Sequence, residues 1–350
     1  MRMLTRINTE IKECCFAYRF RWIILGVGIF VISCSNIYSY SLFSGADIGE
    51  PNTDIRLVKV NIPKEWCFEI AFSGELVRSS YLETDSVSVS NFDFTVPYIE
   101  WTLPLPKNFG VTLGVNEIFN INYDILSPTE QIGSDSVFHN VKSRGSVSDI
   151  NLIGDKNLGN FATVGAGVSL LFGSVEEQWT ANHIRYGTVT DTTAFYYTNS
   201  ATFNGAGIVG NIGLRFGKVE LGASYLGKST LNSSNKLPDR IRTSLSYNII
   251  SDFKIGFGTE DWLFEEPYKP LSRLAITGEV GKKTKYKAGV YKKDWYYGNI
   301  KEKGGMFGVN LLLKSMLQLG LTGEYGIRDN GTLREETYRA YLTIQGKEAF

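Results

Sequence analysis

Apolar and polar residues alternate strictly along several stretches of the chain. Between residues 317 and 325, Leu317, Leu319 and Leu321 occupy one register, whereas Gln318 and Glu324 occupy the other. Successive side chains of a β-strand point to opposite faces, so this stretch is predicted to be a strand with one apolar and one polar face. The same pattern predicts further strands, separated by turn residues, at 163–172, 241–249, 273–280 and 338–345.

Two architectures accommodate such strands. In a soluble β-sandwich the apolar faces point inward and strands run about 5–6 residues, whereas strands of a membrane barrel run about 9–11 residues with their apolar faces toward lipid. Leu271–Gly281 and Met316–Ile327 are longer than nine residues, and the polar register is rich in glycine and hydroxyl residues. Aromatic residues near the segment ends are expected to form interfacial girdles; they are Trp262, Phe264, Trp295, Tyr296, Tyr297, Tyr325 and Tyr338.

The pattern therefore predicts an all-β chain that folds as a single transmembrane, antiparallel, up-and-down β-barrel, with the sandwich as the alternative. Backbone groups in lipid need partners within the protein, so the sheet has to close on itself. From Asn36 the chain has 315 residues, and at roughly 22 residues for a strand and its turn it provides about 14 strands.

The N-terminal segment has the order of a secretory signal. Basic residues precede an 11-residue apolar run, Trp22–Ile32, and the small residues Ser33–Ser35 follow it. The run is too short for a standard membrane-spanning helix, which needs about 20 residues. We expect residues 1–35 to be a signal peptide, 36–55 an N-terminal segment or hatch, and 56–350 an outer-membrane barrel. The alternatives are a soluble helix and a lipoprotein signal that leaves a lipid on Cys34.

Composition narrows the range of functions. Lys and Arg total 36, as do Asp and Glu, so the formal net charge is zero and the basic face that nucleic acid requires is not expected. Two histidines and four cysteines offer little for a metal site. We expect no metal, cofactor or nucleic acid. His139 and His183, in stretches that resemble loops, are expected to be solvated.

Two sequence patterns of nucleotide-binding enzymes occur in the chain, but the structural context that each pattern requires is not predicted. Gly222–Ser229 satisfies the P-loop pattern, and Gly205–Gly210 satisfies GxGxxG, but neither leads into the helix that would present amides to phosphate. Both are predicted to be strands, and no nucleotide or catalytic residue is assigned. Carboxylate pairs such as Glu335–Glu336 are expected to be solvated beside turns. A barrel lipase is the enzymatic alternative.

Several stretches resemble the FadL-type outer-membrane transporters of hydrophobic compounds. They include Leu103–Gly110 followed by Val111–Asn116, Asn211–Gly217 before Val219–Tyr225, Leu237–Tyr247 and Gly323–Arg334. The similar PorV-like group shares this plan. The resemblance implies a barrel of about fourteen strands, plugged by an N-terminal hatch that would lie near Ser41–Asp54. Phe350 at the C-terminus is typical of outer-membrane barrels, although the alternation ends at Ile344.

The resulting hypothesis is a bacterial outer-membrane channel for passive uptake of hydrophobic or amphipathic small molecules such as fatty acids or aromatic hydrocarbons. Its partners would be the lipid bilayer and a hydrophobic ligand in the lumen, and Phe43, Trp66, Phe68 and Phe72 are the candidate ligand-binding residues. The alternative is a PorV-like barrel that docks proteins in export or surface attachment. Its partner would bind long extracellular loops, predicted at Ser127–Asn160 and Tyr186–Thr202.

Overall fold

The structure is a computed structural model, and its description covers most of the chain after residue 61. The described residues are 47–48, 62–81, 89–120, 122–126, 130–132, 135–185, 188–227, 229–231, 235–264, 266, 268–296, 298–314 and 316–348. The predicted signal peptide, Phe43 and Phe350 lie outside them. Among the described residues, no helix is long and apolar enough to cross a membrane.

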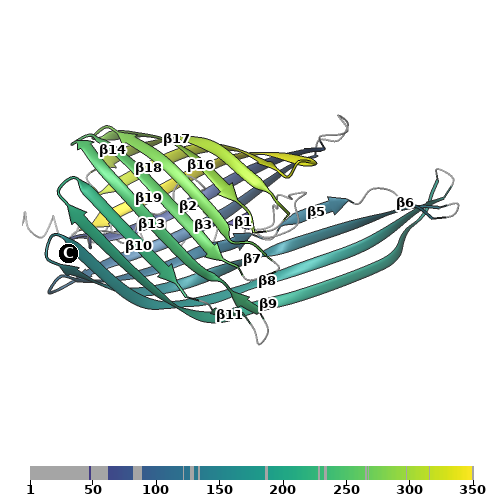
Figure 1. The fold of residues 1–350 in the computed structure, drawn as a ribbon, viewed down its shortest axis with the longest axis horizontal. Coiled ribbons are helices and arrows are strands. Elements are labelled where there is room, and N and C mark those ends of the chain that lie inside the picture. The colour runs from purple at the N-terminus through teal and green to yellow at the C-terminus, as the bar shows by residue number, and fades with distance from the viewer. Residues whose placement is uncertain are drawn as a thin grey trace, which may run out of the picture. The chain divides into compact units, whose positions relative to one another are not determined.

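Fourteen antiparallel strands form a closed barrel (Figure 1). Each strand pairs with the next in chain order, and the last strand pairs with the first from Leu333–Tyr81 to Glu348–Trp66. The prediction of a closed barrel of about fourteen strands is confirmed. The strands are β2 (Trp66–Tyr81), β3 (Val89–Leu105), β4 (Phe109–Asn120), β7 (Asp135–Leu158), β8 (Ala162–Arg185), β9 (Thr188–Phe216), β10 (Val219–Leu226), β13 (Asp239–Ile250), β14 (Phe253–Leu263), β15 (Leu271–Val280), β16 (Thr284–Asp294), β17 (Lys301–Lys314), β18 (Leu317–Asp329) and β19 (Leu333–Glu348).

Within the described part of the chain, five short strands lie outside this ring. β1 (Asp47–Ile48) pairs with the end of β4, and β5 (Tyr123–Leu126) and β6 (Glu130–Ile132) pair with β7. β11 (Ser229–Leu231) and β12 (Asn235–Leu237) form a small hairpin of their own.

The apolar register of each strand faces outward and the polar register faces the lumen. On β18, Leu321 is 55% exposed, whereas Glu324, three residues later in the other register, is 4% exposed. On β8, Leu170 is 51% exposed whereas Ser169 is fully buried. A closed barrel with an apolar outer wall and a polar interior is the arrangement of a barrel that spans a membrane. The soluble sandwich, which needs the opposite orientation, is excluded.

The predicted aromatic girdle is only partly right. Tyr325 and Tyr338 do lie on the outer wall, with their ring centroids 5.1 Å apart. Trp262 and Trp295, in contrast, occupy the inward register and are 0% and 4% exposed. A place near a strand end does not make a residue interfacial, because the register of the strand decides which face a side chain takes.

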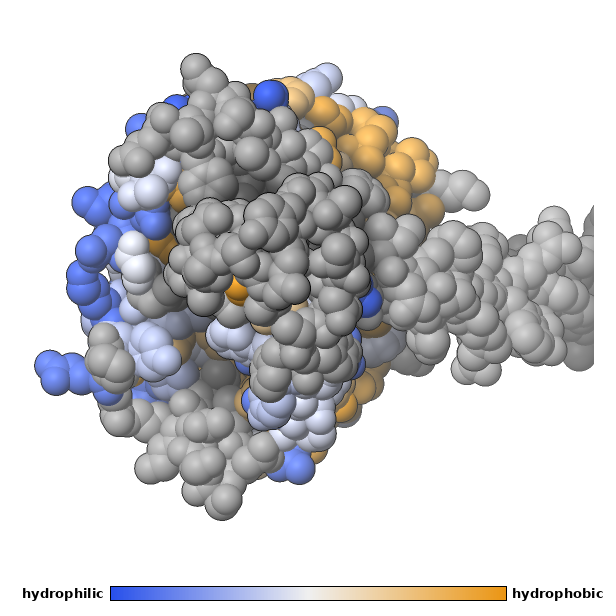
Figure 2. All heavy atoms as spheres, turned by 90° about the vertical axis from the view of Figure 1, so that its right-hand side faces the viewer, coloured by the Kyte–Doolittle hydropathy of each residue, from blue (hydrophilic) through white to orange (hydrophobic). Residues whose placement is uncertain are grey.

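The two ends of the barrel differ. The start of β2 and the end of β19 lie at one end, which we call the turn end, where the connections are as short as 217–218 and 251–252. The opposite end, the loop end, carries longer connections such as 264–270 and 295–300. Figure 2 views the loop end, where hydrophilic residues gather along one side of the rim and hydrophobic residues along the other.

Three strands extend far past their neighbours at the loop end (Figure 1). β7 and β8 have 24 residues each and β9 has 29, and together with β5 and β6 they form what we call the arm. The sequence prediction of long loops at Ser127–Asn160 and Tyr186–Thr202 is therefore wrong over most of both ranges. His139 and His183 also lie in strands, not in loops, on the paired edges of β7 and β8.

Other local expectations meet mixed outcomes. The P-loop pattern falls largely on β10, where Gly222 pairs with Gly213 and Ser244, so its reading as a strand is confirmed. β19 does not end with the alternation at Ile344 but continues to Glu348, paired with Trp66. Glu335 is fully buried and is not the solvated carboxylate that was expected beside a turn.

Candidate functional site

Apolar side chains from distant strands of the ring meet inside the lumen. Phe119 of β4 faces inward, because it pairs with the buried Val147 after a bulge that follows Glu117. Its ring lies 4.9 Å from that of Trp262 on β14, although five strands separate β4 from β14 around the ring. We call the cluster that they form the apolar constriction; its members are Ile118, Phe119, Val147, Leu171, Trp262 and Leu271.

Further aromatic rings connect this constriction with the loop end. Phe264, directly after β14, lies 6.5 Å from Phe119 and stacks on Tyr296 at 4.4 Å. Tyr268 lies 5.8 Å from Tyr296 and is 51% exposed. These five rings, from Tyr268 through Tyr296, Phe264 and Phe119 to Trp262, are named the aromatic path. Aromatic pairs at such distances attract one another and also attract other flat apolar molecules.

Charged residues fix the position of Trp262. Its indole N–H donates a hydrogen bond of 2.7 Å to Glu260, which also accepts one of 2.7 Å from Arg242. Arg273 donates to the same carboxylate, and Arg240 lies 5.0 Å above the indole ring. Glu260 and the Trp262 side chain are both fully buried. A tryptophan held by a hydrogen bond and covered by a guanidinium offers a rigid apolar surface at the narrow point of the lumen.

A second charged cluster joins the first and last strands of the ring. Glu302 on β17 accepts hydrogen bonds from Arg328 at 3.0 Å and from the Tyr291 hydroxyl at 2.8 Å. Arg339 on β19 pairs with Glu75 on β2 at 2.8 Å and with Glu324 at 3.0 Å. We name this the seam network; it comprises Glu75, Lys293, Glu302, Glu324, Arg328, Glu335 and Arg339.

The wall of the barrel is interrupted between β3 and β4. Their ladder runs from Leu105–Phe109 to Tyr98–Asn116 and stops there, although β3 continues to pair with β2 as far as Val89. Pro97, which has no N–H to donate, lies at the point where the ladder stops. Within the described residues, β1 takes this side of β4, since Ile48 pairs with Phe119 and Asp47 with Asn120.

The residues predicted to bind ligand do not lie in this cluster. Phe43 lies outside the described residues. Trp66, Phe68 and Phe72 occupy the register of β2 whose β19 partners include Leu342, which faces outward. Phe68 packs against Trp101 and Phe72 against Phe94. A role for them in binding stays a prediction.

Sequence reasoning missed Trp262 and Phe119, but a signal for Trp262 was present. The inward register of β14 reads Lys254, Gly256, Gly258, Glu260 and Trp262, so the tryptophan is the one large apolar residue in a polar row. Phe119 carried no such signal, because the bulge shifts its register. Among the described residues, no three side chains come together that could hold a metal ion.

Comparisons with known proteins identify relatives in structure but not in sequence. No protein-family model and no curated protein matches the sequence.

The toluene transporter TbuX of Ralstonia pickettii matches with a TM-score of 0.61 at 9% identity, over 89% of this chain and 99% of that one. A FadL homologue of Pseudomonas aeruginosa matches with a TM-score of 0.60 at 10% identity, over 87% and 95%. CymD, a monoaromatic hydrocarbon channel, gives 0.58 at 8% identity, over 89% and 100%. The likeness confirms the FadL-type fold that the sequence predicted, whereas the PorV-like grouping stays a prediction. The chain thus has the barrel fold of toluene transporters and other FadL-type channels.

Proposed function

We propose that this protein is a bacterial outer-membrane channel for passive uptake of hydrophobic small molecules, and that flat aromatic molecules are its preferred solutes. The observation that carries the proposal is the aromatic path, which leads from an exposed tyrosine at the loop end to a closed apolar constriction. Short turns face the periplasm in bacterial barrels and longer loops face outside. The exposed end of the aromatic path would therefore receive solute from the exterior.

Such a route has a physical rationale. A hydrophobic solute enters a charged outer leaflet poorly and gains nothing from a wide, water-filled pore. Stacked rings offer it a sequence of apolar contacts, and the wall of opposing side chains at Phe119 and Trp262 keeps water from following. The place where β3 and β4 separate lies beside Phe119, so the solute could leave the barrel there for the hydrocarbon of the membrane.

Phe264 provides the test, because it links the outer and inner halves of the aromatic path. We expect Phe264→Leu to lower the rate of uptake of toluene at low concentration about tenfold in proteoliposomes, since two or three ring contacts of about 0.5–1.5 kcal/mol are lost. Uptake of a long-chain fatty acid such as oleate, measured in parallel, should fall less.

The matched control is Tyr325→Leu, which removes an aromatic ring from the outer wall of β18. Equal toluene uptake by the two variants, or wild-type uptake no faster than that of empty vesicles, would refute the proposal. Heat-modifiable gel mobility shows whether each variant forms the barrel.

The arm favours a second candidate function, the docking of another protein. Strands of 24 to 29 residues are far longer than a bilayer requires, and β9 in the arm pairs with β8 along one edge. A strand edge and a surface of this extent are suited to binding a partner.

A ladder-matched deletion separates the two functions. Residues 123–143 and 177–199 can be removed together, because Arg144 pairs with Glu176, Glu176 pairs with Ser200, and the Gly145 N–H already bonds to Asn122 at 3.0 Å. If the channel proposal holds, the trimmed barrel folds and takes up toluene at the wild-type rate. Docking would be favoured instead if a protein co-purifies with the wild type but not with the trimmed barrel, and if neither of the two barrels transports toluene.

A further inference from the structure

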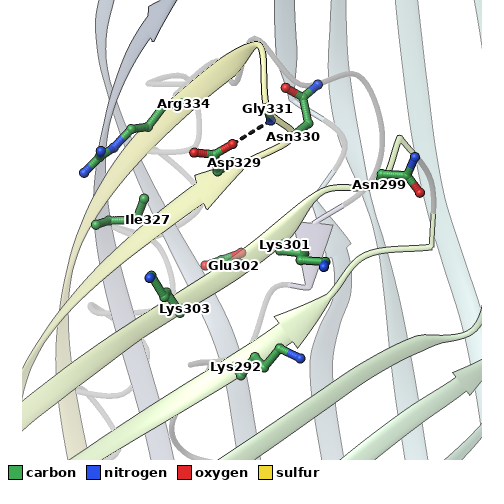
Figure 3. A pocket seen from close by; sticks show the side chains of 10 residues that line it. All are labelled: Lys292, Asn299, Lys301, Glu302, Lys303, Ile327, Asp329, Asn330, Gly331 and Arg334. Atoms are coloured by element: carbon green, nitrogen blue, oxygen red, sulfur yellow. Dashed lines mark hydrogen bonds between the residues drawn. The ribbon is translucent and has the colours of Figure 1, made fainter. Parts of the chain in front are cut away.

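A groove with a basic lining lies on the outer wall near the loop end (Figure 3). It is an open groove of about 780 Å³ between the ends of β16, β17, β18 and β19. Its lining includes four cationic side chains, Lys292, Lys301, Lys303 and Arg334. Ile327 and the two carboxylates of Glu302 and Asp329 also line it. We call it the lysine groove.

The lysines of the groove belong to the outer wall, although the inward Glu302 also contributes to its lining. Lys301 and Lys303 alternate with the fully inward Glu302, and both are exposed. Lys303 pairs with Lys292 on one side and with Ile327 on the other, and Lys301 pairs with Asp329. All of these residues therefore share the register whose lower members are the exposed Phe307 and Leu321.

The level of the groove across the membrane follows from the outward residues that lie between it and the turn end. Along β18, Ile327 is followed toward the turn end by Tyr325 and then by Leu321, and Tyr325 contacts Tyr338 at 5.1 Å. Paired tyrosines above an apolar band mark the boundary between hydrocarbon and headgroups. The next outward row lies about 6–7 Å further along the strand. The lysines are therefore at the level of lipid headgroups.

The lysines have few anionic partners within the protein. Lys292 approaches Asp294 at 3.3 Å and Arg334 approaches Glu336 at 3.8 Å, whereas no ion pair of Lys301 or Lys303 is present among the described residues. Asp329 accepts a hydrogen bond of 2.6 Å from the Gly331 N–H of its own turn. Lys292 and Lys303 are also directly opposite each other on the neighbouring strands β16 and β17. Like charges in this position lower the stability of a sheet. Such a cost is offset when an anion binds between them.

We propose that the lysine groove binds the phosphorylated headgroup of a membrane lipid in the leaflet at the loop end. Lys301 and Lys303 supply charge and N–H donors to the phosphate, and Ile327 and the tyrosine pair contact the upper part of the acyl chains. This inference requires that the barrel spans a membrane, but it does not depend on what the barrel transports.

The test uses the full-length barrel in detergent and titrates it with diphosphorylated lipid A, with the bound lipid counted by native mass spectrometry. In the double variant Lys301→Gln, Lys303→Gln we expect affinity to fall about thirtyfold, since each lysine at a membrane surface is worth about fivefold. Binding to the wild type should also weaken as salt is raised. Lipid A from which both phosphates have been removed should bind to the wild type as weakly as diphosphorylated lipid A binds to the double variant.

Two further variants make the result specific. Lys282→Gln removes a lysine that is 73% exposed at the turn end, so lipid binding should stay at the wild-type level. The double variant Lys301→Arg, Lys303→Arg keeps the charge and should retain most of the affinity for lipid A. It still tests the role of charge if the glutamine variant fails to fold. The proposal is wrong if wild type and glutamine variant bind lipid A equally, or if inorganic phosphate alone binds as tightly as the lipid.

Discussion

Replacing Arg328 by methionine is expected to destabilise the barrel by about 3–5 kcal/mol, the usual cost of removing one partner of a buried ion pair. Arg328 is 2% exposed and lies within 3.0 Å of Glu302, 3.5 Å of Glu335 and 3.7 Å of Glu75. Without it, the four carboxylates of the seam network retain two of the network's three cations, Lys293 and Arg339. Methionine keeps the aliphatic part of the arginine side chain but removes the guanidinium, including its contact with the Trp295 ring at 4.9 Å.

The measurement is the urea concentration at which the detergent-solubilised barrel loses its heat-modifiable mobility. The matched control is Arg215→Met, which removes an arginine that also bonds to a carboxylate, Glu220, but whose side chain is 41% exposed. An exposed pair contributes about 0–1 kcal/mol, so this control should unfold almost as the wild type does. Equal midpoints for the two variants would show that the seam network contributes little to stability.

The second large effect is expected from a covalent link between β1 and β4. Asp47 and Asn120 are directly opposite in an antiparallel ladder, where Cα atoms lie about 4.5–5.5 Å apart, within reach of a disulfide. We propose that β1 belongs to the N-terminal hatch and has to leave Phe119 before a solute can pass. Asp47→Cys with Asn120→Cys should therefore form a disulfide on oxidation and reduce toluene uptake to the level of empty vesicles, and a reductant should restore it.

The experiment is made in a Cys67→Ser background, because Cys67 on β2 is in no disulfide and would compete for oxidation. Each single cysteine variant serves as a control and should transport normally under oxidising conditions. If the disulfide forms and uptake continues unchanged, movement of β1 is not required for passage and the hatch proposal fails.

The alternation of side chains predicted the barrel because a lipid-facing wall forces an apolar residue into every second position. That rule holds for Leu317–Asp329, whose outward leucines and inward Glu324 lie as expected. It fails in the arm, where strands beyond the apolar band carry Ser, Thr and Asn on both faces and so resembled loops.

The site was less accessible to such reasoning. Alternation assigns a residue to a face, but contact between Phe119 and Trp262 depends on the closure of the ring, which brings together strands that are far apart in sequence. Likewise, Glu335 can be buried because it pairs with Arg328, which lies 7 residues earlier on the neighbouring strand. The sequence alone does not show this pairing.

The seam network has a consequence for biogenesis. Its Glu75 lies on the first strand of the ring and its Arg339 on the last, 264 residues later. Charges on the other strands thus acquire their full complement of counter-ions only when the final strand has been inserted. Until the C-terminal hairpin is in place, Glu75 on β2 lacks Arg328 and Arg339, which are its ion-pair partners in the closed ring. The ionic contacts between β2 and the C-terminal hairpin therefore form only when the ring closes.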